Sequence, residues 1–175
     1  SILGLTIDYG PFQFLDGLVS NDMKTVADGG QMLGAFPNAQ GRLLAVVTVF
    51  RQGDRFLFET EEATREKVFN NLFRFTFAGD FFVEDLSDSY SYFELFNTSE
   101  LPASVGGLCS GKEGIFIKTD NAIVFRDQLT TSGAVTIIDD LHETLRIESG
   151  IPKYGIDMDE TTIVPELGLD GLISY

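Results

Sequence analysis

Short apolar runs separated by turn residues predict a series of strands along the chain. The clearest region is 31–60, where turn residues at 38–41 and at Gly53-Asp54 divide apolar, β-branched stretches into an antiparallel meander. The expected strands include 1–8, 43–50, 56–59, 81–86, 90–96, 115–118, 122–125 and 134–138. We therefore expect mainly antiparallel sheets.

Other stretches show the spacing of amphipathic helices. The expected helices are 11–20, 61–77 and 139–150. In the second of these, apolar residues recur at helical spacing on one face from Ala63 to Phe75, and its acidic first turn suits the helix dipole. The third begins with acidic residues and ends at Gly150, a common C-terminal cap. Strands with packed helices in this order predict an α+β fold.

A glycine- and serine-rich stretch, 104–114, reads as a connection between two lobes. With 175 residues the chain is one domain of ordinary size or two small lobes that share a core. We therefore expect a first lobe at 1–103 and a second lobe at 104–175.

The balance of charge excludes several kinds of partner. Twelve basic and 27 acidic residues give a formal net charge of -15, which opposes binding to nucleic acid or to anionic lipid. No apolar run approaches the roughly 20 residues of a membrane span. A single cysteine, Cys109, excludes a disulfide within the chain. No signal peptide is recognisable, so a reducing compartment is expected, the cytoplasm or, in a eukaryote, the mitochondrial matrix.

Few residues suggest chemistry on their own. His142 is the single histidine and is expected to be a solvated helix residue, so no metal site is predicted. Arg146 stands near the end of the last expected helix, before the stretch GIPKYG, in which Pro152 and Gly155 constrain the backbone. Such a rigid segment could hold a guanidinium against a carboxylate of a ligand. An interlobe ion pair with ordinary helix capping explains the same residues equally well.

The stretch LRIESGIPKYGIDMDETTIVPELGLDGL resembles a segment of the YgfZ/GcvT superfamily, which comprises YgfZ-type folate-binding proteins and the aminomethyltransferase (T protein) of the glycine cleavage system. FLDGLVSNDM, NAQGRLLAVVTVFRQGDRFLFET and EEATREKV resemble further family segments in the same order. The resemblance implies a folate-binding-type domain in two lobes and tetrahydrofolate as ligand. It implies that Arg146 binds an anionic part of the ligand and that Tyr154 stacks on it or hydrogen-bonds nearby. Asn21 and Asp22 would shape the pocket from the first lobe.

The chain also departs from this family. Ala45 and Val46 replace a pair of aspartates that the T protein carries, and Glu61 stands where the family has an asparagine. The Gly-Glu of the transferase's pterin-binding turn has no clear counterpart. After Tyr175, YgfZ-type proteins continue with the motif KGCYxGQE and a third lobe. The sequence given is therefore expected to be a fragment or a shortened homologue.

These observations favour a YgfZ-like folate-binding protein that assists the assembly or repair of iron–sulfur proteins, a role implied by the resemblance alone. No catalytic residue is predicted, because an apolar pair at 45 and 46 cannot position a charged amine or assist proton transfer. An aminomethyltransferase dependent on tetrahydrofolate is the alternative enzyme. A scaffold that kept the fold and lost the ligand is the third reading.

Overall fold

The computed structural model describes residues 2–7, 17–74, 76–77, 81–98, 107–110 and 114–167. The chain divides into two compact units, Ser1–Leu86 with Lys153–Tyr175 and Ser87–Pro152. These units do not coincide with the expected lobes, 1–103 and 104–175. The difference arises because residues near the C-terminal end pack on the first unit instead of continuing the second.

The described part of the first unit contains a five-stranded antiparallel sheet with the strand order β2-β3-β4-β1-β5. Its strands are β1 (Ile2–Ile7), β2 (Gln31–Pro37), β3 (Leu43–Gln52), β4 (Arg55–Thr60) and β5 (Phe81–Asp85). The predicted meander is confirmed, with β2, β3 and β4 joined in sequence by tight turns. Gly41 and Gly53 have φ values of 75° and 59°, which glycine adopts without steric cost.

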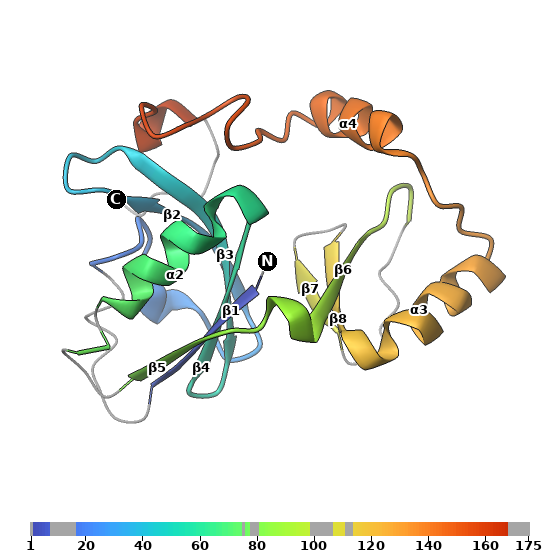
Figure 1. Cartoon of the computed structure of the whole chain (residues 1–175), viewed down its shortest axis with the longest axis horizontal. Coiled ribbons are helices and arrows are strands. Elements are labelled where there is room, and N and C mark those ends of the chain that lie inside the picture. Colours follow the sequence, from blue (N-terminus) through green and yellow to red (C-terminus); the bar gives the residue numbers. More distant parts are fainter. Residues whose placement is uncertain are drawn as a thin grey trace. The chain divides into compact units, whose positions relative to one another are not determined.

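Helix α2 (Arg65–Phe73) follows the short 3-10 helix η2 (Glu62–Thr64) and lies across one face of this sheet (Figure 1). Its buried residues Val68 and Leu72 are four apart and join the main core cluster. From the sheet, β3 contributes alternate residues, including Ala45 and Val47, to the same cluster. The predicted helix at 61–77 is therefore confirmed over its central part, whereas Phe75 lies outside the described residues.

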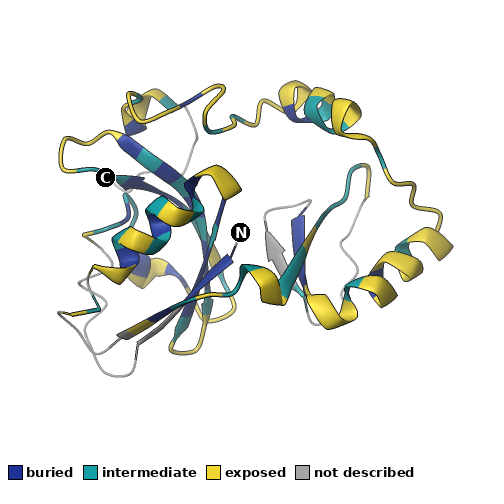
Figure 2. Cartoon of the chain, in the orientation of Figure 1, coloured by how far each residue is buried: buried dark blue, intermediate teal, exposed yellow. Residues whose placement is uncertain are grey.

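The second unit contains a three-stranded antiparallel sheet in its described residues, with the order β6-β8-β7. The strands are β6 (Tyr90–Glu94), β7 (Leu108–Ser110) and β8 (Gly114–Lys118), and the 3-10 helix η3 (Ser87–Ser89) precedes them. Helices α3 (Thr119–Thr131) and α4 (Asp139–Glu148) follow. Figure 2 shows that both helices are largely exposed; each has one buried residue, Phe125 and Arg146 respectively.

Several expectations are wrong in this second half. The stretch 122–125 lies within α3, because its burial follows helical spacing: Phe125 and Leu129 pack on the small core, whereas Ile123 and Val124 are exposed. The stretch 134–138 has no regular structure. Within the expected connection 104–114, residues 108–110 form β7 and pair with β8. The predicted α4 is confirmed, with Gly150 at a φ of 67°.

The expected short helix at 11–20 is not supported where it can be followed. Residues 8–16 lie outside the described residues, and 17–21 form turns and bends. The 3-10 helix η1 (Met23–Thr25) comes next and buries Met23. The prediction of an α+β fold with antiparallel sheets is confirmed. The wrong predictions concern which short apolar stretches form strands.

Candidate functional site

The segment Lys153–Leu167, here called the return segment, packs on the first unit. Met158 and Val164 are buried with Ala35 and Leu43 in a second apolar cluster. The backbone N–H of Leu43 donates to the carbonyl of Thr162 at 2.9 Å. These contacts place the return segment, for which the resemblance implies the ligand residue Tyr154, on the sheet of the first unit.

A tight loop opens the return segment. The N–H of Gly155 donates to the carbonyl of Met158 at 2.7 Å, and Gly155 has a φ of 84°, a conformation that glycine tolerates. The Lys153 N–H donates to the Asp157 carboxylate at 3.0 Å. This loop presents the half-buried side chain of Tyr154, which packs against the second apolar cluster.

Tyr154 is held by two groups from the η2–α2 region. Its backbone N–H donates to both carboxylate oxygens of Glu61, at 3.1 and 3.2 Å. Lys67 Nζ donates to Tyr154 Oη at 3.0 Å and lies 4.9 Å from the centre of its ring. The same ammonium donates to Glu160 at 3.2 Å. A backbone contact, a hydroxyl contact and a cation–π contact therefore converge on one tyrosine.

The hydrogen bond to Tyr154 is the main cause that raises the pKa of Lys67 above its ordinary value. Desolvation opposes this effect, and the bond to Glu160 adds to it. Lys67 therefore keeps its proton to a higher pH than an ordinary lysine.

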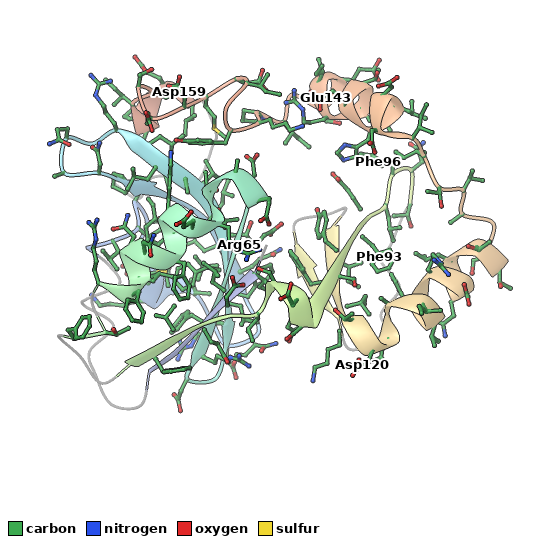
Figure 3. The ribbon with its side chains drawn as sticks, in the orientation of Figure 1. Arg65, Phe93, Phe96, Asp120, Glu143 and Asp159 are labelled. Carbon is green, nitrogen blue, oxygen red and sulfur yellow. The ribbon has the colours of Figure 1, made fainter. Side chains whose placement is uncertain are left out.

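The middle of the return segment is ordered by a side-chain turn at Asp159 (Figure 3). Its carboxylate accepts hydrogen bonds from Thr161 Oγ1 at 2.6 Å and from the Thr161 N–H at 2.8 Å. These bonds lower the pKa of Asp159. Arg42 donates to the carbonyl of Thr161 and forms an isolated bridge with Ile163, which fastens this turn to the start of β3.

The two positions where the T protein carries aspartates face opposite sides of β3. Ala45 is fully buried in the main core cluster, whereas Val46 is partly buried in the cluster that contains Tyr154. Of the two substitutions, Val46 is the one that borders the return segment. The third departure, Glu61, contacts Tyr154 directly. Of the three departures, Glu61 contacts Tyr154 and Val46 packs against the same apolar cluster as Tyr154.

Asn21 and Asp22 have structural partners in this conformation. Asn21 Nδ2 donates to the carbonyl of Leu33 at 3.2 Å, and Leu33 packs in the same cluster as Tyr154. The Asp22 carboxylate accepts from the N–H of Lys24 at 2.9 Å and caps η1. Asn21 is therefore joined to the Tyr154 region through Leu33, and Asp22 stabilises the following turn.

Arg146 belongs to the second unit and is buried, with 8% of its surface exposed. Its guanidinium donates to both carboxylate oxygens of Glu143, from Nε at 3.1 Å and from a terminal nitrogen at 2.8 Å. The other terminal nitrogen donates to the carbonyl of Ile151. Figure 3 shows Glu143 on α4. These contacts favour the interpretation of Arg146 as a helix-end tether.

His142 lies on α4 with its side chain 42% exposed, and it also has partners within the second unit. Its Nε2 lies 2.7 Å from Glu94 Oε2, and its ring meets the edge of Phe96 with centroids 5.9 Å apart. Together these contacts join α4 to the end of β6. Across the described ranges, no group of three or more His, Cys, Asp or Glu side chains is arranged to hold a metal ion.

Lys67, Glu160 and the contact role of Glu61 were missed by sequence reasoning. Lys67 and Tyr154 are separated by 87 positions, and no local pattern links them. A basic residue on the exposed face of a helix is ordinarily interpreted as a solvated surface residue. Only the packing of the return segment reveals that these residues lie close to Tyr154. In the same described part of the chain, no helix is long and apolar enough to cross a membrane.

Comparison with known proteins identifies first the class of fold. The structure matches that of the glycine cleavage system aminomethyltransferase T from Bartonella henselae with a TM-score of 0.69, covering 91% of this chain and 51% of that one. At 16% sequence identity, this match shows the aminomethyltransferase fold. The α+β prediction is confirmed at this level.

Sequence comparison then points to the same class of protein. Over 68 residues the chain is 38% identical to an aminomethyltransferase of Chromobacterium violaceum, which covers 38% of this chain and 19% of that protein. No family model matches the chain. The chain therefore has the aminomethyltransferase fold and a segment similar in sequence to one such enzyme, and it spans about half the length of the solved relative.

Proposed function

We propose that the chain binds tetrahydrofolate or a related reduced folate in its first unit, around Tyr154. The observation that carries this proposal is the return segment: on an aminomethyltransferase fold, it presents Tyr154 between Glu61 and Lys67. The site combines an apolar wall, a carboxylate, an ammonium and a hydroxyl. A few polar groups on an apolar wall are typical of sites for small molecules.

The proposal is for binding without group transfer. Val46 packs against the same apolar cluster as Tyr154, and it stands where the resemblance implies an aspartate in the T protein. An isopropyl group can neither orient a charged amine nor move a proton. A role in the assembly or repair of iron–sulfur proteins, as in YgfZ-type relatives, belongs to this proposal and rests on resemblance. A location in the cytoplasm or the mitochondrial matrix is also part of this proposal.

Aminomethyl transfer to tetrahydrofolate is the second candidate. It is favoured by the sequence similarity to an aminomethyltransferase over 68 residues. A coupled assay with an aminomethyl-loaded carrier protein and tetrahydrofolate separates the two. Turnover by this chain would support the transferase, whereas binding without turnover would support the primary proposal.

That Arg146 binds the anionic part of a folate stays a prediction from the resemblance. Its bidentate pairing with Glu143 means that it would have to exchange one carboxylate for another. Because Arg146→Ala removes a buried tether as well as a cation, loss of binding in that variant would not identify a ligand contact. Tyr154→Phe is a cleaner probe, since it keeps the ring and its packing and removes only the hydroxyl.

Calorimetric titration of the chain with tetrahydrofolate tests the proposed function. We expect saturable binding that Tyr154→Phe weakens about tenfold, or about 1.4 kcal/mol. Tyr92→Phe serves as the matched control, because Tyr92 lies in the second unit against Phe116 with ring centroids 4.8 Å apart. Absence of saturable binding by well-folded protein would support the third reading, a scaffold that has lost its ligand.

A further inference from the structure

The carboxylate of Glu61 occupies a defined position beside Tyr154. Glu61 follows β4 directly and has an extended backbone, with φ -62° and ψ 151°, before the chain turns into η2. Its backbone carbonyl accepts hydrogen bonds from the N–H and the Oγ1 of Thr64, at 3.1 and 3.2 Å. The residue is half-buried, and its orientation is set from two sides.

The hydrogen-bonding capacity of this carboxylate is only partly used. A carboxylate has about four lone-pair sites for donors. Among the described residues, a single N–H, that of Tyr154, donates to it, shared between the two oxygens. The outward lone pair of each oxygen therefore remains available to a further donor.

The neighbouring cations are paired with other acids. Lys67 donates to Glu160, and Arg65 forms ion pairs with Glu62 at 3.2 Å and with Asp85 at 3.0 Å. Glu61 is thus a half-buried acid whose charge is not balanced by a contacting base in the described part of the chain. Such a group favours an incoming N–H donor and disfavours an anion.

These contacts also decide which end of a folate fits beside Glu61. The glutamate tail of a folate is anionic, and bringing it to Glu61 and Glu160 would place like charges together. The pteridine ring carries N–H donors on its 2-amino-4-oxo edge and no formal charge. Val46, Leu33 and Tyr154 pack against the same apolar cluster, which provides apolar surface for a flat ring.

We propose that Glu61 accepts a hydrogen bond from the 2-amino edge of the pteridine ring and so determines how a bound folate is oriented. This inference rests on the proposed binding of folate. It identifies Glu61, at the start of η2 in the first unit, as the carboxylate that a pterin requires. That assignment offsets the missing Gly-Glu turn noted in the sequence.

The test compares tetrahydrofolate with its 2-desamino analogue by calorimetric titration of the full chain. Wild-type protein is expected to bind tetrahydrofolate about tenfold more tightly than the analogue. Glu61→Gln, which keeps the shape and removes the charge, is expected to bring this ratio close to one. Glu62→Gln is the matched control: its side chain is 75% exposed and pairs with Arg65, so the ratio should be unchanged.

The possible results separate this inference from the proposed function. An unchanged ratio in Glu61→Gln would overturn the inference and leave folate binding intact. If that unchanged ratio came with equal weakening of both ligands, Glu61 would act only by holding the Tyr154 loop. No saturable binding by the wild type would overturn both. If Glu61→Gln does not fold, Glu61→Asp retains the charge on a shorter stem and should give an intermediate ratio.

Discussion

Arg146→Ala distinguishes a structural role of this arginine from a role in ligand binding. The side chain is 9% exposed, and its hydrogen bonds include two to Glu143 and one to the carbonyl of Ile151. The substitution removes all three and leaves Glu143 without this partner. We expect the end of α4 and the stretch up to Ile151 to lose protection against local opening.

The expected loss is about 2 kcal/mol. Removing one partner of a fully buried ion pair costs roughly 3–5 kcal/mol, because the other charge is left in a poorly solvated site. The Glu143 side chain is 34% exposed, so water recovers part of that cost. A hydrogen bond that involves a charged group contributes about 1.5–3 kcal/mol, and these bonds are coupled and do not add. The higher helix propensity of alanine offsets only a small part.

Native-state hydrogen exchange of the α4 amides, followed by mass spectrometry, measures this loss. A change of about 2 kcal/mol corresponds to about thirtyfold faster exchange. Arg126→Ala is the control, since Arg126 also lies on a helix and pairs with an acid, Asp127 at 3.5 Å, yet is 62% exposed. It should change exchange by less than about 0.5 kcal/mol. Equal, small effects of both variants, with weaker binding of tetrahydrofolate only in Arg146→Ala, would refute the structural interpretation.

Further predictions concern the first unit. Gly34→Ala should lower the free energy of unfolding, measured by urea denaturation, by about 1–3 kcal/mol, because the new Cβ would lie 2.4 Å from Val19 Cγ1. An unchanged free energy of unfolding would show that Val19 moves aside at little cost. Leu72→Ala should cost about 2–5 kcal/mol in the same assay, since its side chain is fully buried in the main core; a loss below 1 kcal/mol would contradict that packing. Tyr154→Phe should lower the pKa of Lys67, measured by NMR titration of the lysine side chain, because the bond to the hydroxyl is the main cause of its rise. In the wild type, that bond stabilises the fold fully below the ordinary lysine pKa, and its contribution is lost as the pH rises through the higher folded-state value.

Local periodicity was a sound guide for several elements. The meander from β2 to β4, the core of α2 and the whole of α4 follow from spacing and turn residues within short windows. Strand alternation also places residues 45 and 46 on opposite faces of β3. These features depend on interactions between residues close in the chain, so a sequence can specify them.

Short apolar stretches were ambiguous for the opposite reason. The run 122–125 has strand-like composition, yet it lies in α3 because Phe125 and Leu129 meet the small core at helical spacing. β7 was missed since three residues carry too little pattern, and only pairing with β8 stabilises them as a strand. In both cases a partner distant from the local window decided the conformation.

The sequence by itself determined the α+β class and the position of the segment that carries Tyr154. The tertiary structure alone decided that this segment returns to the first unit and that Glu61, Lys67 and Glu160 gather around it. The same packing committed Arg146 to Glu143. The physical reason is that a side chain's partner depends on which surfaces meet when distant segments pack, and no periodicity within either segment encodes that meeting.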